Sequence, residues 1–215
     1  MQQSFWETRW REGRIGFHRD EPNPYLVRHA LAMKGWPGRV FLPLAGKSVD
    51  VPWLRDRGCE VVANEWVKEA VEAFFEEQNL DAVRQPSGDH QLYEAENLRF
   101  FQGDFFSLTR DQVGEVDWAF DRAALIALPT EARSRYVEQL VRLVGADHEL
   151  LLVHVEYDPE GMEGPPFSVS VDEVRTLFRG AHLTLLEEQS ALDDNSRFRA
   201  AGLTWLTERA WRIQL

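Results

Sequence analysis

The stretch Arg39-Val40-Phe41-Leu42-Pro43-Leu44-Ala45-Gly46-Lys47-Ser48 is an apolar run that closes in a short polar turn. A continuous apolar run of this length is typical of a strand that is buried on both faces. We therefore predict a buried strand over residues 39–44, with a tight turn at Gly46.

The tripeptide Gly46-Lys47-Ser48 is similar to the end of a phosphate-binding loop, but one upstream residue argues against that interpretation. A P-loop needs a glycine five residues before its second glycine, and that position is Phe41. The chain also lacks the G-x-G-x-x-G fingerprint of a standard dinucleotide-binding domain. The remaining interpretation is a simple turn from a strand to a helix.

Strand and helix patterns alternate after this turn. Asp50 as a cap, Pro52 in the first turn and Gly58 just past the end bracket a short helix. Residues 60–65 are predicted as a second strand, and an apolar stripe at helical spacing runs over residues 67–75.

The later part of the chain continues the alternation. A helix is expected to end at Gly145, and the polar stretch over residues 85–90, which contains proline and glycine, receives no element. The further strand candidates are residues 98–101, 118–120, 150–155, 183–186, 203–206 and 211–213. Parallel strands need crossover connections and cover on both faces. The pattern therefore predicts an α/β fold with a mostly parallel sheet and a C-terminal antiparallel hairpin.

Length and composition limit the classes of function. The 215 residues fit one domain, and the net charge of −12 without a Lys/Arg cluster disfavours nucleic acid and anionic membranes as partners. Small molecules are the expected partners. The single cysteine, Cys59, precedes an apolar run and is expected to be a buried thiol. Residues 1–14 resemble neither a signal peptide nor a membrane anchor, so we expect a cytoplasmic protein.

Acidic residues follow the second and third predicted strands, where an open α/β sheet binds its ligands. Glu65 ends the second strand about twenty residues after the first turn, a position suited to an acid that accepts hydrogen bonds from ribose hydroxyls. A solvated acid before a helix is the alternative. Asp104 and Phe105 suit an adenine amino group and ring, or else a turn with core phenylalanines.

The fourth strand ends in Asp121 and Arg122. Arg122 is suited to an anionic or strongly polar substrate group, and an internal salt bridge is the competing interpretation. Trp6 and Trp10 are one helical turn apart in a short helix expected to end near Gly13. They either belong to the core or close over a cation such as a sulfonium. The histidines show no ligand-like spacing, so no metal site is expected.

Several segments, taken together and in order, resemble the thiopurine S-methyltransferase family, especially its bacterial members. The matching segments are Phe5-Trp6, Arg9-Trp10, Ile15-Gly16-Phe17-His18, Pro43 to Ser48 with Asp50 and Trp53-Leu54, Gly103-Asp104-Phe105-Phe106, Asp121 to Leu125 through Leu128-Pro129, and Gly164 to Val169. They span nearly the whole chain.

The resemblance implies a single class I, Rossmann-like methyltransferase domain over residues 1–215, with a seven-stranded sheet and S-adenosylmethionine as methyl donor. It implies that residues 1–35 form a lid over the cofactor site and that the protein is a monomer. The implied cofactor residues are Trp10, Leu44, Glu65, Asp104, Phe105 and Arg122, and the implied acceptor residues are Trp6, Phe17 and Arg197. Arg122 would also position the acceptor, without a dedicated general base.

The chain departs from the family pattern at two places. Ala45 replaces a usual cysteine, and Ala63-Asn64 replaces the glycine usually found before the acid of the second strand. The activity implied is S-methylation of thiopurines or related aromatic thiols, with selenium or tellurium compounds as further acceptors. The alternatives are an NAD-dependent oxidoreductase on a doubly wound fold and a non-catalytic protein that binds or senses a metabolite.

Overall fold

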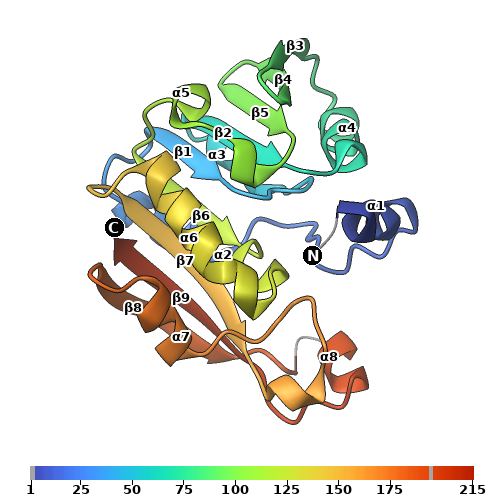
Figure 1. Cartoon of the computed structure of the whole chain (residues 1–215), viewed down its shortest axis with the longest axis vertical. Helices are drawn as coiled ribbons and strands as arrows, with labels where there is room; N and C mark the ends of the chain where they lie inside the picture. The colour runs from blue at the N-terminus through green and yellow to red at the C-terminus, as the bar shows by residue number, and fades with distance from the viewer. Residues whose placement is uncertain (1–2, 194–195) are drawn as a thin grey trace.

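The structure is a computed structural model that describes residues 3–193 and 196–215, and in this part of the chain all strands join one sheet (Figure 1). The strand order is β3-β4-β5-β2-β1-β6-β7-β9-β8. The five central strands run parallel: β1 (Arg39–Leu42), β2 (Glu60–Glu65), β5 (Leu98–Gln102), β6 (Trp118–Arg122) and β7 (Glu149–Glu156). The outer strands pair antiparallel: β3 (Val83–Ser87), β4 (His90–Ala95), β8 (His182–Ser190) and β9 (Thr207–Gln214).

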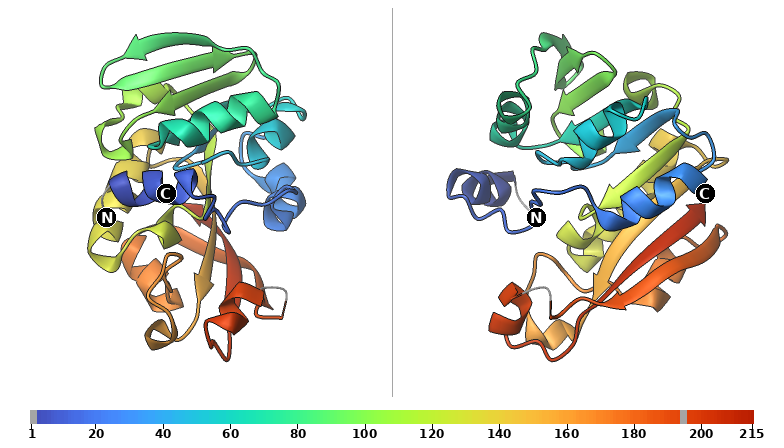
Figure 2. Two further views of the ribbon diagram at one scale, coloured as in Figure 1. Left: turned by 90° about the vertical axis from the view of Figure 1, so that its right-hand side faces the viewer. Right: turned by 180° about the vertical axis from the view of Figure 1, so that it is seen from behind.

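Helices cover both faces of the sheet, and each face has its own apolar cluster (Figure 2). One face carries α2 (Pro24–His29), α3 (Asp50–Arg55) and α4 (Lys68–Glu77). The other carries α5 (Arg110–Val113), α6 (Thr130–Val144) and α7 (Val171–Leu177). Short 3-10 turns complete the connections: η1 (Ala30–Ala32), η2 (Phe105–Ser107), η3 (Leu125–Ala127) and η4 (Pro159–Gly161). Burial of alternate strand residues on the two faces explains the continuous apolar runs.

The predicted α/β fold is confirmed. The expected seven strands correspond to β5-β2-β1-β6-β7-β9-β8, with the antiparallel pair at the C-terminal edge. The strand order reverses at β1, which has β2 on one side and β6 on the other. A crevice at the carboxyl ends of the strands is expected at such a reversal. Cys59 is buried just before β2, as predicted.

Two additional strands, β3 and β4, make the strand count higher than predicted. They form an antiparallel pair in which Ser87 faces His90 across the turn at Gly88 and Asp89. β3 is almost wholly exposed and contains Pro86. Because an edge strand needs no apolar face and tolerates a proline, the hydrophobic pattern gave no signal there.

The predicted strand over residues 203–206 is wrong. This segment has no regular structure, although Leu203 and Leu206 are buried in the cluster beneath α6 and α7. Its apolar residues cover the core, and β9 begins only at Thr207. The C-terminal pair is therefore β8 with β9, joined by a long connection that contains α8 (Ser196–Ala200).

The N-terminal segment lies at the carboxyl edge of the central strands (Figure 1). The predicted helix is α1 (Gln3–Arg11), which lies beside α4. No residue of α1 is fully buried, so its position depends on contacts of partly covered aromatic side chains. Within the described residues, no helix has the length and apolar character needed to cross a bilayer.

Candidate functional site

A pocket of about 540 Å³ opens at the carboxyl ends of the parallel strands. Its volume lies in the range of about 300–1,000 Å³ that is usual for small-molecule sites. Residues of the N-terminal segment and of the segments around Pro165 and Arg197 close its sides. All nine site residues named from the sequence line this pocket: Trp6, Trp10, Phe17, Leu44, Glu65, Asp104, Phe105, Arg122 and Arg197.

The turn after β1 brings main chain to the pocket. Leu44 has a φ of 47° and Gly46 a φ of 57°. The first value is unusual for a residue with a branched side chain, and such outliers gather at functional sites. The Trp10 ring lies directly over Gly46, because a Cβ there would be 3.1 Å from Trp10 Cζ2. A side chain at position 46 would crowd the indole and strain the backbone, so glycine favours this close approach.

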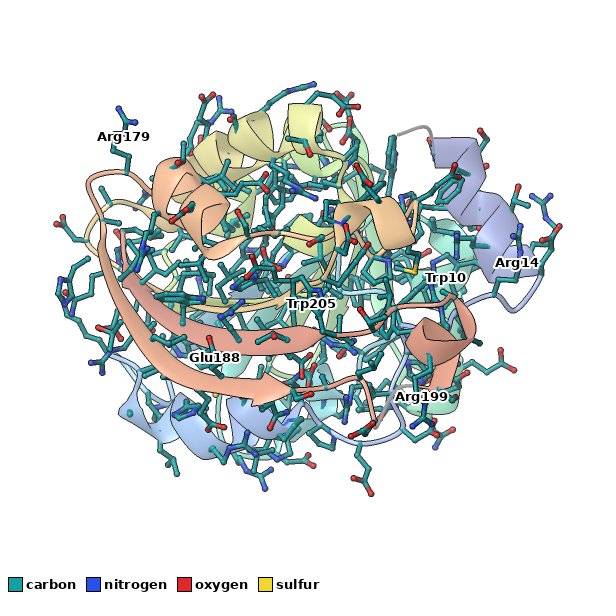
Figure 3. The ribbon with its side chains drawn as sticks, turned by 90° about the horizontal axis from the view of Figure 1, so that it is seen from below. Trp10, Arg14, Arg179, Glu188, Arg199 and Trp205 are labelled. Carbon is teal, nitrogen blue, oxygen red and sulfur yellow. The ribbon has the colours of Figure 1, made fainter. Side chains whose placement is uncertain are left out.

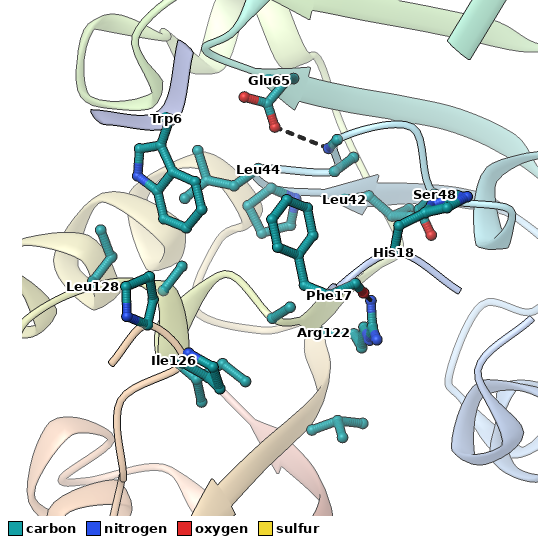
Figure 4. Close-up of a pocket in the computed structure, with 18 of the residues that line it drawn as sticks. Trp6, Phe17, His18, Leu42, Leu44, Ser48, Glu65, Arg122, Ile126 and Leu128 are labelled. Carbon is teal, nitrogen blue, oxygen red and sulfur yellow. Dashed lines mark hydrogen bonds between the residues drawn. The ribbon is translucent and has the colours of Figure 1, made fainter. Parts of the chain in front are cut away.

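Glu65 ends β2 with its carboxylate in the pocket wall (Figure 4). Its Oε2 accepts the Gly46 N–H at 2.9 Å, and its Oε1 accepts the Val67 N–H at 2.8 Å. Only 7% of the residue is exposed, so the alternative of a solvated acid is wrong. Burial raises the pKa of Glu65, and backbone hydrogen bonds from Val67, Gly46 and Trp66 oppose this shift. A carboxylate offers about four acceptor positions, so those that the backbone leaves free can serve a ligand.

Asn64, one of the departures from the family pattern, has a structural role next to Glu65. It is fully buried, and its Nδ2 donates to the carbonyls of Phe101 and Gly103 at 3.1 Å each. Asn64 thereby joins the end of β2 to the end of β5. The two acids that follow these strands, Glu65 and Asp104, are held on one pocket wall.

The Gly103-Asp104-Phe105 turn has the arrangement of the second sequence interpretation, a turn with a core phenylalanine. Asp104 caps η2 through its Oδ1, which accepts the Phe106 N–H at 3.0 Å, and it lines the pocket. Phe105 is 1% exposed and packs on Tyr136, with ring centroids 4.9 Å apart. Its ring is a core ring, and little of its surface is left for a ligand.

Asp121 and Arg122 point to opposite faces of β6 and form no salt bridge with each other. Asp121 accepts the Tyr136 hydroxyl at 2.7 Å and the amides of Ala124 and Leu125. Arg122 lines the pocket, and its Nη1 donates to the Phe17 carbonyl at 2.8 Å. This bond ties the N-terminal segment to the sheet across 105 residues of sequence. Burial lowers the pKa of Arg122, and the charge of Asp50 opposes this shift.

We expect Asp121→Asn to change how stability depends on pH. Burial raises the pKa of Asp121 from 3.8 to about 6, so the native state binds more protons than the unfolded state between these values. Stability present below about pH 4 is therefore lost as the pH rises to about 6, by about 3 kcal/mol. Asparagine does not titrate, so the variant should lack this contribution.

Urea unfolding at several pH values from 3.5 to 7 measures the effect. Asp172→Asn is the matched control, because Asp172 has a side chain that is 91% exposed. Superimposable pH profiles for Asp121→Asn and the wild-type protein would refute the raised pKa.

Aromatic rings from the N-terminal segment meet over the pocket. Phe17 contacts Trp6 and Trp10 edge to face, with centroid distances of 5.9 and 5.7 Å. Figure 4 shows Trp6 and Phe17 turned toward the pocket, with Arg122 below Phe17. Arg197 Nη2 donates to the Pro165 carbonyl at 2.9 Å, and its guanidinium packs against Gly16. Four segments distant in the sequence therefore converge here.

Three pocket acids, Asp50, Glu131 and Glu208, were not singled out as site residues. Asp50, predicted as a helix cap, is instead the first residue of α3, where Val49 is the cap position. Its Oδ1 accepts the Asn23 N–H at 2.6 Å, and its Oδ2 accepts the Ser48 hydroxyl at 2.8 Å. The Asp50 carboxylate therefore holds two loops together and does not cap the helix. Glu208 comes from the start of β9. Spacing gave no signal for Glu208, because the last strand of the chain is remote in sequence from the central turns.

The pocket residues fit S-adenosylmethionine. Glu65 has free acceptor positions for ribose hydroxyls, the aromatic rings suit a sulfonium, and Arg122 suits a carboxylate. Across residues 3–193 and 196–215, no group of three or more His, Cys, Asp or Glu side chains is arranged to hold a metal ion.

Comparison with known proteins identifies relatives over the full chain. The family model for thiopurine S-methyltransferase matches residues 1–215. Thiopurine S-methyltransferases from Methylococcus capsulatus and Pseudomonas fluorescens are each 42% identical to this chain, covering 100% of it and 98% and 99% of their own length.

A more distant similarity links the fold to solved structures. The Burkholderia thailandensis 1,6-didemethyltoxoflavin-N1-methyltransferase, solved with 1,6-didemethyltoxoflavin and S-adenosylhomocysteine, superimposes with a TM-score of 0.62 at 20% identity. The match covers 98% of this chain and 86% of that one. At this identity the similarity concerns the fold.

Proposed function

Because the chain belongs to the thiopurine S-methyltransferase family, we propose that it transfers the methyl group of S-adenosylmethionine to the sulfur of an aromatic or heterocyclic thiol. The observation that carries this proposal is the pocket in which Glu65, Arg122 and the ring of Phe17 come together. Thiopurines are the natural test acceptors.

The cofactor side of the proposed site lies over β1, β2 and β5. Glu65 accepts the ribose hydroxyls with the lone pairs that Gly46 and Val67 leave free. Asp104 accepts the adenine amino group, and Phe105 supports that wall from the core. The main chain at Leu44 and the ring of Trp10 enclose the centre of the cofactor. Arg122 binds the carboxylate of the methionine moiety.

The acceptor side of the proposed site lies beyond Arg122, among Trp6, Phe17 and Arg197. When bound, S-adenosylmethionine would supply a sulfonium methyl group to a thiolate. The new sulfur–methyl bond would form in line as the sulfonium sulfur–methyl bond breaks, and S-adenosylhomocysteine would leave with that electron pair. The protein contributes by holding the two reactants at near-attack distance in a site that excludes water. Arg122 and Arg197 favour the anionic form of the acceptor, so a dedicated general base is unnecessary.

Residues 1–35 act as a lid in this proposal, although the first two lie outside the described residues. The Arg122 to Phe17 hydrogen bond and the ring contacts of Trp6 and Trp10 would hold the lid closed. Closure over the pocket would complete the wall of the acceptor site.

Cofactor specificity separates this function from the oxidoreductase alternative. S-adenosylhomocysteine at 100 times its Kd stabilises the native state by about 2.7 kcal/mol. For a chain of this size, we expect the Tm to rise by about 5–10 °C. NAD should leave the Tm unchanged, because the turn after β1 lacks the glycine-rich fingerprint. A larger shift with NAD would contradict the proposal.

Transfer of labelled methyl then separates an enzyme from a metabolite sensor. Purified protein is incubated with labelled S-adenosylmethionine and a panel of thiopurines, aromatic thiols, selenides and tellurite. We expect product with the aromatic thiols, since the acceptor side is largely apolar and aromatic. Selenolates follow the same in-line chemistry and are included for that reason. Tight cofactor binding without transfer to any acceptor would support the sensor.

A further inference from the structure

Glu208 is an acid in the pocket that the proposed chemistry does not use. It lies in β9 opposite Val155 of β7, and Arg122 lies in β6 opposite Val153 of β7. Val153 and Val155 are two residues apart, so strand alternation turns both toward the pocket, although Val155 also packs in the apolar cluster of the opposite face. Arg122, the two valines and Glu208 therefore form one continuous part of the pocket floor.

This floor carries opposite charges on its two sides. Glu208 is partly buried, and burial raises its pKa while the charges of Arg122 and Arg19 oppose the shift. Tyr25 of α2 and Gln189 of β8 are donors beside Glu208 that also oppose the shift, and burial together with the charge of Glu208 raises the pKa of Tyr25. An acid taken partly out of water is costly unless donors reach it.

Glu208 is far from the ribose-binding end of the pocket. β2, which carries Glu65, and β9, which carries Glu208, are separated in the sheet by β1, β6 and β7. A molecule that binds against Val153 and Val155 therefore meets Glu208 at one edge and Arg122 at the other. This is the acceptor side of the site.

We propose that Glu208 is an acceptor-recognition residue that selects thiols whose ring also carries an N–H or amino donor. The inference rests on the proposed function. A flat acceptor would lie on the two valines with its thiolate toward Arg122 and its donor toward Glu208. Sites that hydrogen-bond a substrate donor reject analogues that lack it, because the buried polar group is left unpaired.

A matched pair of acceptors tests this assignment. 2-Mercaptobenzimidazole and 2-mercaptobenzothiazole have similar shapes, and the second has a sulfur in place of the ring N–H. We expect wild-type protein to prefer the first in kcat/KM by about 10- to 100-fold, chiefly through KM. Glu208→Leu should abolish that preference, and Glu208→Gln, which keeps an acceptor oxygen, should retain part of it.

Direct binding of the two thiols to the complex of the protein with S-adenosylhomocysteine separates the possible outcomes. Isothermal titration of the two thiols reports acceptor preference even if no methyl is transferred, so failure of the proposed function is seen separately. Affinity for S-adenosylhomocysteine should stay within about twofold in both variants. Glu188→Gln, at an exposed position of β8 (Figure 3), is the matched control. An unchanged thiol preference, or a selective loss of cofactor affinity, would overturn the assignment.

Discussion

Replacing Glu65 with glutamine is expected to weaken the binding of S-adenosylhomocysteine about 100-fold. Both carboxylate oxygens of Glu65 accept backbone N–H groups, from Gly46 and from Val67. Glutamine has one oxygen, so its amide nitrogen must face one of these donors in a buried place. Losing charge-assisted bonds to the ribose costs about 1.5–3 kcal/mol, and about 2.8 kcal/mol corresponds to 100-fold.

Isothermal titration measures the affinity, and thermal unfolding shows how much of the loss reflects a weakened turn. Glu60→Gln is the matched control at the other end of β2, where the acid is exposed and paired with Arg39 at 2.6 Å. An exposed pair contributes little, so this variant should behave as wild type. Glu65→Asp keeps the charge, so its Kd should fall between those of Glu65→Gln and Glu60→Gln. A Kd for Glu65→Gln within threefold of wild type would remove Glu65 from the cofactor site.

Replacing Arg122 with alanine should reduce kcat/KM for a thiopurine by about 100- to 1,000-fold. The change removes the donor to the Phe17 carbonyl and a positive charge that acts on both Asp50 and Glu208. Leaving buried charges unpaired costs about 3–5 kcal/mol, and about 1.4 kcal/mol corresponds to tenfold in rate. Arg122→Lys keeps the charge without the planar fork and should lose less.

Steady-state kinetics and titration with S-adenosylhomocysteine distinguish loss of chemistry from loss of binding. Limited proteolysis of the N-terminal segment adds an independent readout, because Arg122→Ala removes the donor to the Phe17 carbonyl, whereas Arg122→Lys keeps an N–H donor. Arg179→Ala is the control, at an exposed position after α7 (Figure 3). If turnover and cofactor affinity both survive Arg122→Ala, the assigned role of this residue is wrong.

The sequence determined the order of the central elements and the edge of the sheet where the site lies. Apolar runs and helical stripes are local patterns, so β1, β2, α4, β6 and β7 follow from neighbouring residues alone. The carboxyl ends of parallel strands lie at one edge of the sheet, and this geometry places Leu44, Glu65 and Arg122 at that edge. All three line the same pocket.

Only the tertiary structure decided which way particular side chains face. Adjacent residues of a strand point to opposite faces, and register fixes the choice. Asp121 consequently bonds Tyr136 in the core while Arg122 enters the pocket. Phe105 packs on Tyr136, although spacing alone left an adenine contact open.

The tertiary structure also decided which distant segments meet. Phe17 and Arg122, and likewise Arg122 and Glu208, come together because β9 inserts between β7 and β8 and the N-terminal segment folds across the sheet edge. No local pattern encodes that insertion, since strand order depends on the free energy of the whole packed sheet. The stretch at residues 39–48 indicated where the site lies, and the tertiary fold determined which other residues face the site.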